Sequence, residues 1–78
     1  MLRTQVTPKR ALYVSLTDDT HPNKGGFYCQ VYEDEMGEFE CDNFVIHNYE
    51  IPRIITDANE RRRKAMVIAN ARVKQLFR

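Results

Sequence analysis

The chain has 78 residues and carries 12 Lys and Arg against 11 Asp and Glu, for a formal net charge of +1. Hydrophobic residues make up 42%, and only three Gly and three Pro are present, so a disordered, fibrous or linker chain is excluded. This length predicts one domain over residues 1–78 with a single small core. The apolar runs are far shorter than the roughly 20 residues that span a bilayer, and the N-terminus lacks the apolar region of a signal peptide. We therefore expect a cytoplasmic protein, in the host cytoplasm if a phage encodes it.

The first part of the chain predicts a free segment followed by a strand. Residues 1–10 are polar and basic and are expected to form a loose N-terminal arm. Leu12, Val14 and Leu16 alternate with polar residues, which predicts a half-buried strand over residues 11–17. The turn-forming residues 18–26 then predict a loop to a second strand.

Two further alternating segments predict a hairpin with a three-residue loop. The loop ends at Gly37, where a positive φ carries no steric cost. Its length places Val31 opposite Cys41 in the predicted pairing. The predicted core face holds Phe27, Cys29, Val31, Phe39, Cys41 and Val45. The opposite face is predicted to hold Tyr28, Gln30, Tyr32, Glu38, Glu40, Asp42, Phe44 and Ile46.

The C-terminal part of the chain predicts one amphipathic basic helix over residues 56–77. Thr56 or Asp57 is expected to cap its N-terminus, with Glu60 at the spacing of a capping box. Arg62 falls within the apolar stripe, and its guanidinium is expected to extend past the edge of the core. The predicted stripe consists of Ala58, Ala65, Met66, Ala69, Val73, Leu76 and Phe77. The predicted fold class is α+β: a three-stranded antiparallel β-meander over residues 11–49 packed on one long C-terminal α-helix (βββα).

The near-neutral net charge conceals a strong segregation. Residues 25–52 carry seven carboxylates and no Lys or Arg, whereas residues 53–78 carry eight basic side chains against two acidic ones. The hairpin is therefore acidic and the helix basic. Such opposed surfaces are self-complementary, so a homodimer is one predicted arrangement.

The outer face of the hairpin predicts a protein-binding site. Aromatic side chains inside a polar rim have the composition of an interface centre. The predicted protein-binding residues are Tyr28, Tyr32, Glu38, Glu40, Asp42, Phe44 and Ile46. Tyr13 extends this patch if the first two strands pair. Two other interpretations stay open: the N-terminal arm or a dimer partner covers the patch, or nucleic-acid bases stack on the tyrosines.

The outer side of the helix predicts a second, basic surface. The candidate nucleic-acid-binding residues are Arg63, Lys64, Lys74 and Arg78. The alternatives are a solvated charged face and pairing with an acidic partner, including the acidic hairpin of a second copy.

Residue types that support catalysis or metal binding are present without the spacing that such chemistry needs. His21, Cys29, Cys41 and His47 form a Cys2His2 set that lacks paired C-x-x-C spacing. Both cysteines are expected to be reduced core residues, with a disulfide between them as the alternative. We predict no enzyme, no cofactor, no metal and no catalytic residue.

Together these features predict a small non-enzymatic protein-binding module with an acidic aromatic sheet face. Small phage proteins that block CRISPR or restriction complexes are similar in size and style, which implies an inhibitor of a nucleic-acid-handling host complex. The alternative is a nucleic-acid-binding domain that uses the basic helix. The predicted topology resembles that of the arm-binding domains of tyrosine recombinases, which read DNA with basic and aromatic residues on the exposed sheet. At the matching positions this chain has Glu38, Glu40 and Asp42.

Overall fold

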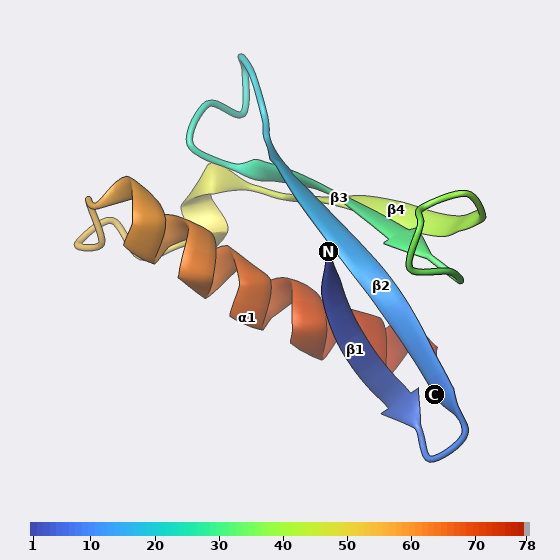
Figure 1. Cartoon of the computed structure of the whole chain (residues 1–78). Helices are drawn as coiled ribbons and strands as arrows, with labels where there is room; N and C mark the ends of the chain where they lie inside the picture. The colour runs from blue at the N-terminus through green and yellow to red at the C-terminus, as the bar shows by residue number, and fades with distance from the viewer. Residues whose placement is uncertain (78) are drawn as a thin grey trace.

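The computed structural model describes residues 1–77 and shows a sheet packed on one face by a helix (Figure 1). The strands, in sheet order as in chain order, are β1 (Leu2–Thr7), β2 (Arg10–Asp18), β3 (Phe27–Tyr32) and β4 (Glu40–Ile46). All three strand pairings are antiparallel. A short 3-10 helix η1 (Asn48–Glu50) leads to α1 (Ala58–Leu76). The α+β class and the C-terminal helix are confirmed, but the expected three strands are a miscount, because the described residues form four.

The fourth strand comes from the segment that was expected to be a loose arm. Residues 2–7 pair with β2, with Leu2 opposite Val14 and Thr4 opposite Leu12. Side chains alternate along this edge strand, so Arg3 and Gln5 are exposed on the helix-free side while Leu2 and Thr4 face the helix side. The arm prediction is therefore wrong, because pairing with β2 orders a segment that has little apolar content of its own.

The core lies between the sheet and α1. The buried apolar residues are Leu12, Val14, Leu16, Phe27, Cys29, Val31, Ile46, Ile51, Ala65, Ala69 and Val73. The helix meets the sheet through Ala65, Ala69 and Val73, and these small side chains allow a close approach. Each fully buried Val, Leu, Ile or Phe contributes about 1.5–3 kcal/mol, so this cluster supplies most of the driving force for folding.

The ends of α1 follow the local signals in the sequence. The Asp57 carboxylate accepts a hydrogen bond from the Glu60 backbone N–H at 3.0 Å, which confirms the predicted N-cap. Arg62 also extends past the core as predicted, because its guanidinium donates to the Leu16 carbonyl at 2.8 Å. The apolar stripe is shorter than expected, since Ala58 and Leu76 are exposed.

A β-bulge in β4 changes the predicted register of the hairpin. Tyr32 lies opposite Glu40, but Val31 lies opposite Asp42, so Cys41 has no partner across the strand pair. Every later residue of β4 therefore faces the side of the sheet opposite to the predicted one. Cys41 and Phe39 were expected in the core and are exposed. Phe44 and Ile46 were expected on the outer face, yet Phe44 is half-buried on the helix side and Ile46 is fully buried.

The observed register of β3 and β4 predicts different reactivities for the two free thiols, those of Cys29 and Cys41. Cys41 is exposed and should react with a thiol reagent in the native protein. Burial raises the pKa of Cys29 to about 11, so its thiol should react only as fast as the protein unfolds. Native labelling followed by mass spectrometry should show one modification at Cys41 and a second only in denaturant. Rapid labelling of both thiols in the native state would contradict the bulge and the burial of Cys29.

Candidate functional site

The helix-free face of the sheet is a neutral polar surface that contains three tyrosines. On adjacent strands, Tyr13 lies opposite Tyr32, and Tyr28 lies opposite Thr17 and Val45. Between these two rows lie Ser15, Gln30 and Asn43. Directly opposite side chains in antiparallel strands are neighbours on one face. We call this surface, which consists of Tyr13, Ser15, Thr17, Tyr28, Gln30, Tyr32, Asn43 and Val45, the open face.

Charged side chains flank the open face only at its two edges. Arg3 of β1 lies opposite Tyr13, and Glu40 of β4 lies opposite Tyr32. The row from Arg3 to Glu40 therefore runs from a cation at one edge, across two tyrosines, to an anion at the other. An incoming partner would meet opposite charges at the two edges.

The β3–β4 turn, residues 33–39, is strongly acidic and is held in one shape by the carboxylate of Asp34. Asp34 accepts hydrogen bonds from the backbone N–H groups of Glu38 and Phe39, at 3.0 and 2.8 Å. The bond from Glu38 is the main reason why the pKa of the Asp34 carboxyl lies below its ordinary value, since it stabilises the charged form. Gly37 has a φ of 74°, as the sequence predicted. The turn therefore has a defined conformation, although it carries several carboxylates.

Two large apolar side chains stand in solvent within this acidic turn. Met36 is 80% exposed and Phe39 is 65% exposed. The turn approaches the open face, because a Cβ placed on Gly37 would lie 3.8 Å from the Tyr32 ring. The turn and the tyrosine pair Tyr13 and Tyr32 therefore adjoin each other. We call the turn, this pair and the adjoining Glu40 the acidic patch.

The structure brings together only some of the residues predicted for this site. Tyr28, Tyr32 and Glu40 lie on the open face, and Glu38 lies in the acidic turn. The assignment of Asp42, Phe44 and Ile46 to the same patch is wrong, because the bulge turns them to the helix side. Sequence reasoning missed Met36 and Phe39. The sequence signal for this longer turn was Asp34, three residues before Gly37. An aspartate that accepts backbone hydrogen bonds holds residues beyond the glycine in the turn, so they do not join the strand.

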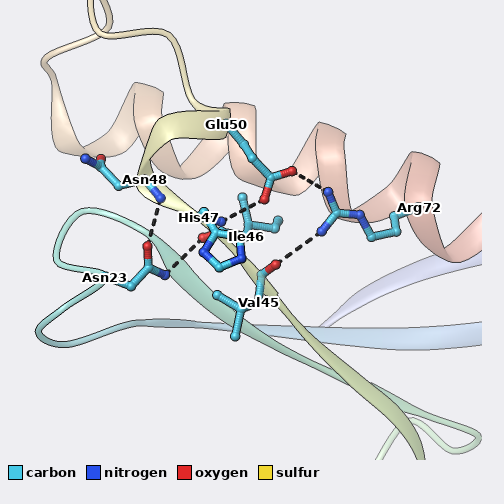
Figure 2. Close-up of polar contacts among 7 residues, drawn as sticks. All are labelled: Asn23, Val45, Ile46, His47, Asn48, Glu50 and Arg72. Carbon is cyan, nitrogen blue, oxygen red and sulfur yellow. Dashed lines mark hydrogen bonds and ion pairs between the residues drawn. The ribbon is translucent and has the colours of Figure 1, made fainter.

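Arg72 makes a set of contacts that fastens α1 to β4 (Figure 2). The Arg72 guanidinium lies 5.2 Å from the centre of the Phe44 ring and donates to the Val45 carbonyl at 3.2 Å. It also forms an ion pair with Glu50, whose other carboxylate oxygen accepts from the His47 N–H at 2.8 Å. We call Arg72, Glu50 and the groups they bind the arginine clamp.

The same corner of the molecule is tied to the β2–β3 loop by an asparagine. Asn23 donates from its side chain to the Ile46 carbonyl at 3.3 Å and accepts from the Asn48 N–H at 2.8 Å (Figure 2). Arg61 adds a further connection from the helix, through the Ile55 carbonyl at 2.8 Å and the Asn48 side chain. These polar side chains satisfy backbone groups where the sheet ends, which is a structural role.

The cations of α1 therefore divide into two groups. Arg61, Arg62 and Arg72 donate to backbone carbonyls of the sheet and loops. Within residues 1–77, Arg63, Lys64 and Lys74 are exposed and form no ion pair. Arg78, the fourth predicted nucleic-acid-binding residue, lies outside the described residues. The exposed cations are the ones that remain for an external partner.

Neither a metal-binding cluster nor a similar protein identifies the function of these surfaces. The described part of the chain contains no group of three His, Cys, Asp or Glu side chains that could hold a metal ion. No helix within residues 1–77 is long and apolar enough to cross a membrane. No protein-family model, curated protein or solved structure matches the chain. The candidate site therefore stands on its own geometry.

The shape of the acidic turn depends on Gly37. A Gly37→Ala substitution places a Cβ at positive φ and 3.3 Å from the Met1 methyl group, so it should cost about 1–2 kcal/mol of unfolding free energy. Urea denaturation measures this change. Glu35→Ala in the same exposed turn is the control and should shift the midpoint little. Equal midpoints for the two variants would contradict the turn geometry.

The arginine clamp predicts an acid-sensitive contribution to stability. Although burial acts to raise it, the pKa of Glu50 is lowered, because the His47 N–H and Arg72 stabilise the carboxylate. This contribution is complete at neutral pH and is lost as pH falls below about 4.5 toward the lowered pKa. Glu50→Gln should therefore cost about 1–2 kcal/mol at pH 7 and less in acid.

Urea denaturation at a series of pH values tests the clamp. The difference in urea midpoint between the wild type and Glu50→Gln should shrink as pH falls below about 4.5. Glu35→Gln is the matched control and should follow the wild-type curve. A constant difference at all pH values would show that the Glu50 charge does not stabilise the fold.

Proposed function

We propose that this protein is a small binding module, with no catalytic activity of its own, that attaches to another protein through the acidic patch. The observation that carries the proposal is the exposure of Met36 and Phe39 among five carboxylates, those of Glu33, Asp34, Glu35, Glu38 and Glu40. Large apolar side chains in a polar ring are the usual energetic anchors of protein interfaces. Burial of Phe39 by a partner would contribute about 1.5–3 kcal/mol.

The charge of the patch supports a partner with a basic surface. Glu33 is paired with Arg10, whereas Glu35, Glu38 and Glu40 form no ion pair within residues 1–77. Free carboxylates steer the approach of a cationic partner and select against acidic ones. A groove that binds nucleic-acid phosphates has this complementary charge. We therefore favour a nucleic-acid-handling complex as the partner, with inhibition of that complex, in the manner of phage-encoded inhibitors, as the outcome.

The shape of the turn also supports binding. The Asp34 carboxylate and the Glu33 N–H, which donates to the Phe39 carbonyl at 2.9 Å, hold the turn before any partner arrives. A preorganised turn loses little conformational entropy on association, so more of the contact free energy appears as affinity. This order favours a recognition surface over an unstructured acidic loop.

A second candidate function is nucleic-acid binding through α1. The exposure of Arg63, Lys64 and Lys74 without an ion pair favours it. Phosphate contacts by such a row would make the affinity fall steeply with salt. The row is short, however, because Arg61, Arg62 and Arg72 are bonded to the fold. We therefore rank this function below protein binding.

Affinity capture from native host lysate, with and without nuclease, tests the two functions. The wild-type chain should retain the same basic protein complex in both conditions. Phe39→Ala combined with Met36→Ala should reduce capture about tenfold or more, since both anchors are removed. Both side chains are exposed, so stability should change little.

Two further variants identify the surface that is used. Ile54→Ala removes an equally exposed apolar side chain, 89% exposed and outside the acidic patch, and should leave capture unchanged. Arg63→Glu combined with Lys64→Glu reverses the helix charge. If capture requires intact nucleic acid and is lost only in the helix variant, nucleic-acid binding is the correct function and the acidic patch is not the site.

A further inference from the structure

A second surface lies at the other edge of the sheet, where β1 runs beside α1 (Figure 1). We infer that the groove between β1 and α1 binds an extended acidic peptide segment of another protein, which adds to the sheet as a fifth strand beside β1. This inference does not depend on the acidic patch, because the groove and the patch contain different residues. It gives the protein a second partner of opposite charge.

The edge of β1 offers backbone hydrogen bonds to an added strand. β1 pairs with β2 on one side only, so alternate backbone N–H and C=O groups on its other side face away from the sheet. The strand extends over six residues, Leu2–Thr7, which spans about 20 Å. Strand addition along such an edge derives affinity from the main chain and specificity from alternate side chains.

A groove of about 400 Å³ runs along this edge between strand and helix. Its walls are residues 2–5 of β1 and the side chains of Met66, Val67, Asn70 and Lys74 on α1. Val67 is 61% exposed, and Met66 is half-buried beside it. A peptide side chain that pointed into the groove would therefore meet an apolar wall at one end and the amide of Asn70 further along.

The floor of the groove contains a buried polar group without a partner. Thr4 is 1% exposed, and among the described residues nothing hydrogen-bonds its hydroxyl. A buried unpaired hydroxyl destabilises a fold, and a valine of the same shape would avoid this penalty. A hydroxyl that both donates and accepts is suited to a polar side chain of an added strand. This observation points to a ligand independently of the free strand edge.

The charge of the groove selects an acidic segment. Lys74 of α1 is the charged side chain that lines it, and no carboxylate lines it; Arg3 lines it from the edge strand, with its side chain on the open face beside Tyr13. Arg63 and Lys64 lie one helical turn before Val67, which extends the positive potential. An alternating segment with an apolar residue against Val67 and a carboxylate near Lys74 fits this surface.

The same charges disfavour a second copy of the chain as the occupant. Antiparallel pairing of two β1 strands about a two-fold axis would place both α1 helices on the same side of the joined sheet. Lys74, Arg63 and Lys64 of the two copies would then repel each other across the new interface. An acidic partner removes this repulsion.

A displayed library of random octapeptides, selected on the full chain, tests the inference. The enriched peptides should be acidic and should alternate apolar with polar residues. Titration of one synthetic selected peptide should shift the amide NMR signals of β1 and of residues 66–74. The same peptide with N-methylated alternate amides, which cannot form strand hydrogen bonds, should bind about tenfold more weakly or not at all.

Three variants separate the groove from general electrostatics. Lys74→Glu should weaken binding of the selected peptide about tenfold, whereas Arg53→Glu, which makes the same charge change outside the groove, should have little effect. Thr4→Val should weaken binding about threefold to tenfold while it maintains or raises the urea midpoint. That opposite effect on binding and stability is not expected of a residue with only a structural role.

Other outcomes overturn the inference. Enrichment of basic or uncharged peptides would show that the groove does not select acidic segments. Unchanged affinity of the N-methylated peptide would exclude strand addition. Salt-sensitive dimers in sedimentation of the protein alone, with β1 at the interface, would identify a second copy as the occupant. Tighter binding of a single-stranded oligonucleotide at the same signals would identify a nucleic acid.

Discussion

The bulge at Cys41 is the constraint on which the rest of the molecule depends. The added residue turns Phe44 and Ile46 toward α1, where Ile46 joins the core and Phe44 lies under Arg72. With the register unshifted, Asn43 and Val45 would lie opposite Cys29 and Phe27 in those places and would bury less apolar surface. The bulge therefore completes the core and sets the base of the arginine clamp.

The basic side chains of α1 serve two purposes, and arginine and lysine are partly divided between them. Three arginines, Arg61, Arg62 and Arg72, bond backbone carbonyls or side chains at the end of the sheet. A guanidinium has five donors in a fixed plane, so one side chain can satisfy several acceptors at once, which an ammonium does less well. Lys64 and Lys74 remain exposed. The helix thus holds the fold with most of its arginines and presents the remaining cations to solvent.

The two proposed surfaces have opposite charge and different architecture. The acidic patch presents Met36 and Phe39 from a turn that its own aspartate shapes, so the proposed recognition there would depend on side chains. The groove beside β1 presents a free strand edge above a buried hydroxyl, so the inferred recognition there would depend on the backbone. A single domain with both surfaces could bring a basic and an acidic partner together. The near-neutral net charge of the chain conceals these two opposed surfaces.

The sequence by itself determined the features that neighbouring residues control. The alternation over residues 11–17, the positive φ of Gly37, the Asp57 cap and the helix all follow from local stereochemistry and periodicity. It did not determine the pairing of residues 2–7, the bulge, or which predicted patch residues share a face. Those features depend on which of the alternative sets of strand residues is buried against α1, and α1 is distant from the strands in the chain. Only the packed structure decides that competition, because apolar burial depends on contacts in space and a one-residue register shift exchanges the two faces.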